Sequence, residues 1–255
     1  MKLGIALSGG GARGMAHIGV LQALDEMGVK FSVASGTSAG SIVAALYAYG
    51  YKPAEIFEIV RHLSIFKSVR PAWTWAGLFK MDGLTALLKK HIPENDFGAL
   101  KIPLTVATTD IRKGVVHYFT KGELIPAIVA SCSIPAFFHP VVHNGGLYVD
   151  GGLTDNLPVL PIRDHCDFVV GSHCNHINPD FDARSLKVLI ERSLLMAISA
   201  NTLVSRQMCD VFIEPPHMDR YSSLARGKSK EIFEYAYHFT KQNFMPHQFQ
   251  KSNTV

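Results

Sequence analysis

The chain has 255 residues, enough for one α/β domain with a large hydrophobic core, and its length does not require a second domain. Hydrophobic residues make up 47% of the sequence and charged residues 18%, a balance that excludes an intrinsically disordered chain. The formal net charge of +4 comes from 25 basic and 21 acidic residues. This mild charge permits contact with an anionic surface but does not indicate nucleic-acid binding.

The N-terminal apolar run is too short for a signal peptide and ends in glycines, so we expect a buried strand there. No stretch approaches the ~18 uninterrupted apolar residues of a membrane span. The four cysteines are scattered and form no Cys-x-x-Cys pair, which indicates free thiols in a reducing compartment, and we expect a cytoplasmic protein. These cysteines are Cys132, Cys166, Cys174 and Cys209.

Strands alternate with helices along the chain. A strand over residues 2–7 leads through a glycine run into a helix that ends near Gly28, and a strand over 31–35 leads into a helix over 39–49. This order predicts an α/β fold of three layers with a central, mostly parallel sheet. Further helices are expected at 53–62, 83–91 (capped by Asp82), 125–131, 184–208 and 228–243, and strands at 102–108, 115–119, 141–142, 147–149, 168–171 and 211–213. Without a linker or repeat, we expect a single domain over 1–245 and a frayed tail over 246–255.

Residues 36–40, Gly-Thr-Ser-Ala-Gly, fit the Gly-x-Ser-x-Gly pattern of a nucleophile elbow between a strand and a helix. Such a strained turn lifts the oxygen of Ser38 clear of the backbone. Gly36 and Gly40 have no Cβ atom, so neighbouring chain segments can approach the turn closely. Unpaired amides at the helix N-terminus favour developing negative charge there. The alternative is a Gly/Ser loop in which Ser38 caps the helix.

The glycine run at residues 9–14, Gly-Gly-Gly-Ala-Arg-Gly, supports two interpretations. It satisfies the dinucleotide fingerprint Gly-x-Gly-x-x-Gly, but Ser35 and Gly36 stand where that fingerprint wants an acidic residue. Both interpretations place clustered amides and a helix N-terminus against an anion. In a hydrolase this anion is the tetrahedral oxyanion, and the neighbouring elbow favours the hydrolase.

A serine nucleophile needs a base, and none of the twelve histidines carries a distinctive local signature. His17, His139 and His143 are more simply explained as structural or exposed residues. His173 and His176 lie beside Cys174 but lack a recognised zinc spacing, so we expect no metal site.

Asp150 is the better candidate for the base. It ends a predicted strand, as the serine does, and Gly151 and Gly152 let the chain turn without covering the carboxylate. Strand ends at one edge of a parallel sheet are where such folds place their sites. The alternative is a turn-forming Asp-Gly pair. A carboxylate with an ordinary pKa near 4 is a poor base, so the pair would need contact in a dry site.

Three segments, at residues 9–14, 36–40 and 150–152, resemble the signature blocks of the patatin-like phospholipase family in kind, order and approximate spacing. The segments 102–110, 130–135 and 155–158 resemble intermediate blocks of its bacterial members. The likeness covers roughly residues 3 to 175 and is weaker beyond them.

The resemblance implies an acyl-ester hydrolase without a cofactor, acting on lipid esters through a Ser-Asp dyad and an acyl-serine intermediate. Ser38 is then the nucleophile, Asp150 the base, and the glycine run the oxyanion hole, with Arg13 supporting it. The residues carried over for that loop are Gly9, Gly10, Gly11, Arg13 and Gly14. The resemblance leaves the substrate and the oligomeric state open. Two alternatives are a dinucleotide-binding oxidoreductase and a non-hydrolytic lipid-binding or regulatory module on the same fold.

Residues 64–81 interrupt the regular pattern with aromatic residues beside basic ones, among them Trp73, Trp75 and Phe79. One interpretation is a mobile flap that touches a membrane interface, which would make the protein peripheral to the membrane. The other is an ordinary excursion whose aromatic side chains pack over the sheet.

Overall fold

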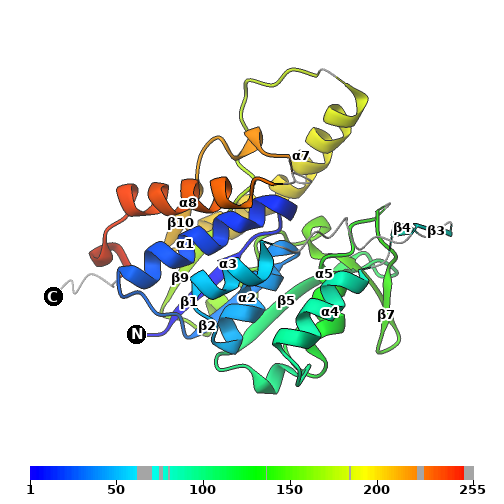
Figure 1. The fold of residues 1–255 in the computed structure, drawn as a ribbon, viewed down its shortest axis with the longest axis horizontal. Coiled ribbons are helices and arrows are strands. Elements are labelled where there is room, and N and C mark those ends of the chain that lie inside the picture. The colour runs from blue at the N-terminus through cyan, green and yellow to red at the C-terminus, as the bar shows by residue number, and fades with distance from the viewer. Residues whose placement is uncertain are drawn as a thin grey trace.

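The computed structural model describes residues 1–61, 71–74, 77–79, 81–135, 137–183, 185–222 and 227–249, the second and third of these ranges by their backbone alone. Figure 1 shows a central sheet flanked by helices. Within these ranges the strands are β1 (Leu3–Leu7), β2 (Val33–Thr37), β3 (Pro71–Thr74), β4 (Gly77–Phe79), β5 (Leu104–Asp110), β6 (Val115–Phe119), β7 (Val141–His143), β8 (Gly146–Asp150), β9 (Phe168–Ser172) and β10 (Val211–Ile213).

Eight of these described strands form one sheet in the order β10-β9-β1-β2-β5-β8-β7, with β6 also paired to β5. The five strands from β10 to β5 run parallel, whereas β6 and β8 run antiparallel to β5. β3 and β4 form a separate antiparallel pair. The predicted α/β fold with a mostly parallel sheet is therefore confirmed.

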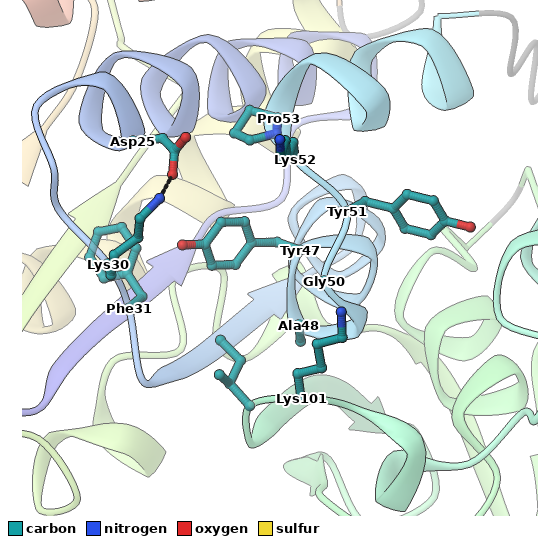
Figure 2. Close-up of a pocket in the computed structure, with 11 residues that line it drawn as sticks. Asp25, Lys30, Phe31, Tyr47, Ala48, Gly50, Tyr51, Lys52, Pro53 and Lys101 are labelled. Atoms are coloured by element: carbon teal, nitrogen blue, oxygen red, sulfur yellow. Dashed lines mark hydrogen bonds and ion pairs between the residues drawn. The ribbon is translucent and has the colours of Figure 1, made fainter.

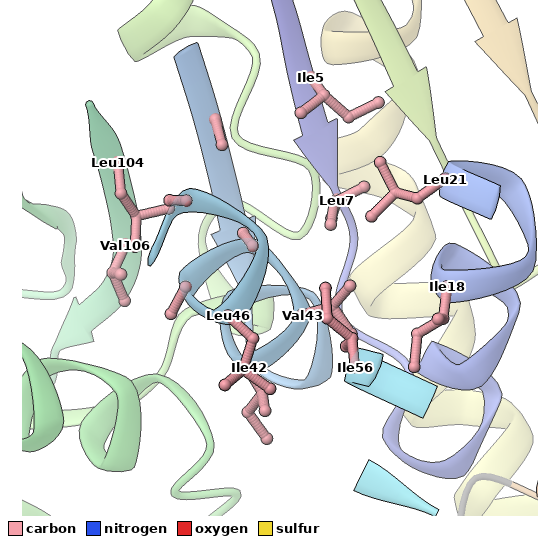
Figure 3. Packing of buried hydrophobic residues seen from close by; sticks show 14 of the residues in the cluster. Ile5, Leu7, Ile18, Leu21, Ile42, Val43, Leu46, Ile56, Leu104 and Val106 are labelled. Carbon is pink, nitrogen blue, oxygen red and sulfur yellow. The ribbon is translucent and has the colours of Figure 1, made fainter. Parts of the chain in front are cut away.

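Helices cover both faces of this sheet. They are α1 (Met15–Glu26), α2 (Ala39–Tyr49), α3 (Pro53–Val60), α4 (Asp82–His91), α5 (Leu124–Ser131), α6 (Leu160–Arg163), α7 (Leu186–Gln207) and α8 (Ser229–Asn243). Side chains along β1 alternate between the two faces, as the two-residue period of a strand requires. Ile5 and Leu7 enter the larger core with α1 and α2 (Figure 3), whereas Ala6 enters a smaller core with Ile162 of α6.

Two local predictions need correction. Asp82 is the first residue of α4, and Met81 occupies the cap position without a side-chain hydrogen bond. The frayed tail predicted from residue 246 is wrong for its first four residues, because Pro246–Phe249 form a 3-10 turn whose Phe249 side chain is buried in the larger core. Residues 250–255 lie outside the described residues.

Candidate active site

Ser38 occupies the turn between β2 and α2 in a strained conformation. Its φ of 51° and ψ of −124° place a non-glycine residue in the region that L-amino acids rarely adopt. Two glycines let the turn close. A Cβ on Gly36 would lie 2.6 Å from the backbone of Gly40, and a Cβ on Gly40 would lie 2.3 Å from the carbonyl oxygen of Leu7. The serine is 7% exposed.

The C-terminal end of α5 and the residues just after it hold the backbone of both predicted catalytic residues. The buried Ser131 hydroxyl accepts the Ser38 backbone N–H at 2.8 Å and donates to the Ala107 carbonyl at 2.6 Å. Two residues later, the Ser133 carbonyl accepts the backbone N–H of Asp150 at 2.9 Å. Sequence reasoning missed these roles. The signal available was the resemblance of residues 130–135 to a family block, which assigns no role to either serine.

Asp150 reaches this site by a route different from the predicted one. We expected Ser38 and Asp150 to share the carboxyl edge of parallel strands, but β8 runs antiparallel to β5. Thr37 pairs with Ala107, and the next residue of β5, Thr108, pairs with Asp150. β8 therefore approaches the carboxyl edge of the parallel strands from outside and ends at the level of the serine, about two strand spacings or roughly 10 Å across the sheet.

The Asp150 carboxyl group is buried, at 6% exposure, with half of its hydrogen-bonding capacity unused. Oδ1 accepts the backbone N–H of Gly152 at 2.8 Å, while Oδ2 has no hydrogen-bond partner of good geometry among the described residues. Burial raises the pKa of Asp150 to about 6, and the Ser38 hydroxyl and Gly152 amide oppose that rise. The Ser38 hydroxyl is thus the neighbouring side chain that stabilises the ionised form of Asp150.

The two glycines after Asp150 differ in what surrounds them. A Cβ on Gly151 would lie 2.3 Å from the Ala107 carbonyl oxygen, so the chain must pass directly against β5 there. A Cβ on Gly152 would meet the Asp150 Oδ1 at 3.0 Å, a milder contact. Asn201 of α7 fixes this turn, because its Nδ2 donates to the Gly152 carbonyl and its Oδ1 accepts the Asn156 backbone N–H, both at 3.0 Å.

The glycine run lies against the elbow. A Cβ on Gly9 would be 3.2 Å from the Cβ of Ser38 and 2.7 Å from the side-chain oxygen of Asn156. The Gly9 amide donates to the Asn156 carbonyl, whereas the amides of Gly10 and Gly11 donate to no group among the described residues. The run continues as a 3-10 turn, Gly11–Gly14, into α1. Within the described part of the chain the amides of Gly10 and Gly11 are therefore unused backbone donors, and they directly follow Gly9, the glycine that packs against Ser38.

Arg13 supports this loop through a chain of polar contacts. Its side chain is buried, with Nε donating to the Tyr221 carbonyl at 2.6 Å and Nη1 to the Asn175 side-chain oxygen at 3.4 Å. Asn175 in turn donates from Nδ2 to the Gly9 carbonyl at 2.6 Å. The guanidinium group thus supports Gly9, the first glycine of the run, through the side chain of Asn175. Gly14 packs on the elbow helix, because a Cβ there would lie 2.6 Å from that of Ala39.

The nearby histidines have structural surroundings. His17 is fully buried, with Nδ1 at 2.8 Å from the Ser172 hydroxyl and Nε2 at 2.8 Å from the Ser8 carbonyl oxygen, and burial lowers its pKa to about 4. His173 and His176 both face the carboxylate of Glu214.

A pocket of about 240 Å³ lies at the far end of α2 from Ser38 (Figure 2). Tyr47, Tyr51, Lys52 and Lys101 line it, and none of the predicted site residues does. The predicted flap falls largely outside the described residues: Trp75 is not described, and nothing is described of the side chains of Trp73 and Phe79.

A family model described as Patatin-like phospholipase matches residues 5–162, more than half of the chain, including all three signature blocks. The chain belongs to the patatin-like phospholipase family. An uncharacterized NTE family protein of Mycobacterium bovis is 34% identical over 163 residues, covering 63% of this chain and 45% of that protein. Lysophospholipase NTE1 of Candida glabrata is 27% identical over 282 residues, covering 94% of this chain and 16% of that protein.

The chain therefore spans less than half the length of these two relatives. The crystal structure of VipD from Legionella pneumophila has the same fold, with a TM-score of 0.61 at 17% identity over 94% of this chain and 66% of that one. The family predicted from the three blocks is confirmed. Membership favours the hydrolase interpretation of the glycine run over the dinucleotide fingerprint.

Proposed function

We propose that the protein is a serine acyl hydrolase that cleaves carboxylic esters of lipids through a dyad of Ser38 and Asp150. The observation that carries this proposal is the buried Asp150 carboxylate with an unused oxygen beside a strained, glycine-flanked serine. Family membership and a relative named lysophospholipase support the lipid ester as substrate.

In this mechanism Asp150 acts as the general base. It takes the hydroxyl proton of Ser38 as Oγ attacks the ester carbonyl carbon, forming a tetrahedral oxyanion. Collapse of this intermediate breaks the bond to the alkoxy group, which takes the proton from Asp150 and departs as an alcohol. Asp150 then takes a proton from water, whose oxygen attacks the acyl-serine. Collapse of this second intermediate breaks the bond to Ser38 Oγ, which takes the proton back from Asp150, and the fatty acid is released. A pKa of about 6 keeps the carboxylate mostly ionised at pH 7 while making it a stronger base than an ordinary aspartate.

The oxyanion is stabilised by the glycine run. The backbone N–H of Ser38 is already committed to the Ser131 hydroxyl and is not free to donate to substrate. The amides of Gly10 and Gly11 have no acceptor among the described residues, so they are the donors we assign to the developing charge. Removing a donor of this kind costs roughly 3–4 kcal/mol of transition-state stabilisation in studied enzymes.

A lipid hydrolysis panel tests the proposal. Phospholipids, lysophospholipids, glycerides and a water-soluble short-chain ester are each incubated with wild type, Ser38→Ala and Asp150→Asn, with Ser32→Ala, before β2, as the serine control. We expect at least one ester to be cleaved by wild type and the control, and activity to fall ~1,000-fold or more in the two dyad variants. Folded dyad variants that keep wild-type activity would contradict the dyad. Lipid binding by the wild type without hydrolysis of any ester would instead favour the non-hydrolytic module.

A further inference from the structure

Helix α7 presents an unusual outer face. Its 22 residues correspond to about 33 Å of helix. Among the side chains of α7 that the structure describes, exposed positions recur at spacings of three and four, and Arg206 near the C-terminal end is the charged residue among them. Val188 is also exposed but lies off this face by helical spacing. The large apolar residues on the face are Leu186, Leu189, Ile190, Met196, Leu203 and Val204, with exposures up to 73% at Leu186 and 65% at Val204. We call these six residues the outer stripe.

This arrangement reverses that of an ordinary surface helix, whose apolar side faces the core. Among the side chains of α7 that the structure describes, the buried ones are the polar Thr202 and Ser205, and Asn201 hydrogen-bonds to the turn after Asp150. Arg192 and Arg206 lie along one flank of the outer stripe by helical spacing. Figure 1 shows α7 reaching out beyond α1 and α8.

The inner face of α7, opposite the outer stripe, contacts the proposed active site. Asn201 bonds to the Gly152 carbonyl, and the Ile198 side chain lies 3.7 Å from where a Cβ on Gly152 would be. Gly152 in turn donates its amide to the Asp150 carboxylate. The inner face of α7 therefore touches the loop of the proposed base while its outer face is turned to solvent.

We propose that α7 lies on the surface of a lipid aggregate or membrane and that its outer stripe inserts into the apolar layer. This inference rests on the proposed function, since a lipid substrate is held in such a surface. An apolar helix face with basic residues on its flank binds the boundary between headgroups and acyl chains. By docking beside the loop that bears Asp150, α7 would bring the site to its substrate.

Two other roles of the apolar face of α7, a membrane-spanning helix and a dimer interface, make different predictions. Among the described residues, Val188–Gln207 is long and apolar enough by length and composition to cross a membrane. A spanning helix would have to place Asn201, Thr202 and Ser205 in the hydrocarbon or give up their contacts with the protein, which is costly. A second copy of the chain could also cover the stripe. The arginine flank and the contact with the site favour the lipid surface.

Vesicle binding tests the inference independently of catalysis. The starting protein is Ser38→Ala, so no lipid is consumed, and the vesicles are phosphatidylcholine with or without phosphatidylglycerol. The test variant adds Leu189→Glu, Met196→Glu and Leu203→Glu. A matched control adds Ile111→Glu, Val142→Glu and Leu160→Glu, which change the same charge at exposed apolar positions outside α7. Thermal melting verifies that both variants fold.

We expect the starting protein and the control to bind vesicles, more tightly when phosphatidylglycerol is present. The α7 variant should bind about 1,000-fold more weakly, about tenfold for each of the three lost insertions. With Ser38 restored, the α7 variant should hydrolyse a water-soluble short-chain ester as the wild type does. Equal vesicle binding by the α7 variant would overturn the docking role. So would resistance of the bound protein to alkaline carbonate, which indicates a spanning helix, or a solution dimer that only the α7 variant dissociates. Retained hydrolysis by Ser38→Ala would overturn the proposed function while leaving the docking result valid.

Discussion

Replacing Asp150 by asparagine should abolish activity and make the protein more stable than the wild type at neutral pH. This difference in stability should grow as the pH rises, because the wild type loses stability while asparagine does not titrate. The carboxyl group has a folded-state pKa of about 6, against an ordinary value of 3.8, because burial penalises the charged form. Below pH 3.8 the group is protonated in both the folded and the unfolded chain. Between pH 3.8 and 6 the unfolded chain releases the proton while the folded chain keeps it, so stability falls as pH rises.

The size of this effect follows from the two pKa values. Moving a carboxyl pKa from 3.8 to about 6 corresponds to about 3 kcal/mol of lost stability once the pH exceeds 6. Asparagine keeps the size of the side chain and can keep the acceptor for the Gly152 amide, but it does not titrate. The difference in unfolding free energy between Asp150→Asn and wild type should therefore grow by about 3 kcal/mol between pH 3 and pH 7.

Urea denaturation at several pH values measures this difference, and kcat/KM for a soluble ester measures the catalytic side. Wild-type activity should fall about tenfold per pH unit below 6, because only the ionised carboxylate accepts the serine proton. Adding ethanol should move this inflection to higher pH, since a less polar solvent disfavours a carboxylate, whereas a histidine base would move to lower pH. A stability difference that stays flat from pH 3 to 7, or an inflection that moves down, would refute the reasoning.

Three further predictions concern the contacts that hold the site. Ser131→Ala leaves the buried Ser38 amide without its acceptor and should cost about 1–3 kcal/mol of stability and at least about tenfold in kcat, whereas Ser133→Ala, whose hydroxyl donates to a helix carbonyl, should change kcat little. Gly151→Ala forces a Cβ against the Ala107 carbonyl and should reduce activity ~100-fold, while Gly152→Ala should retain most of it; equal losses would contradict the packing argument. Asn201→Ala removes the two side-chain hydrogen bonds to the turn after Asp150 and should lower kcat more than it raises KM, as steady-state kinetics will show.

Short-range patterns made much of this fold predictable from the sequence. The glycine run and the Gly-x-Ser-x-Gly pattern each need a particular local backbone. The strands over 2–7 and 31–35 and the helix over 39–49 appear within two residues of the predicted bounds. Local chemistry of this kind is written in consecutive residues, so one sequence is enough to read it.

Long-range relations were less accessible. The direction of β8 depends on how the hairpin formed by β7 and β8 returns to β5. The sequence of a strand that ends in Asp150 does not show whether the strand runs parallel or antiparallel to its neighbour. Ser131 and Asn201 act on residues that are far away in the sequence. Asn201 lies in no recognised motif, and the family block that contains Ser131 assigns it no role. The raised pKa of Asp150 likewise follows from burial, which no neighbouring residue reveals. These features emerge only once the sheet brings distant segments together.

The most direct test of the account is covalent labelling of Ser38. A fluorophosphonate probe reacts with a serine activated by a base and leaves a structural serine untouched. We predict that the probe labels the wild-type protein at Ser38, as peptide mass spectrometry will locate, that the rate declines below pH 6, and that folded Ser38→Ala and Asp150→Asn proteins are not labelled. An unlabelled, folded wild-type protein, or labelling that persists in folded Asp150→Asn at the wild-type rate, would contradict the dyad.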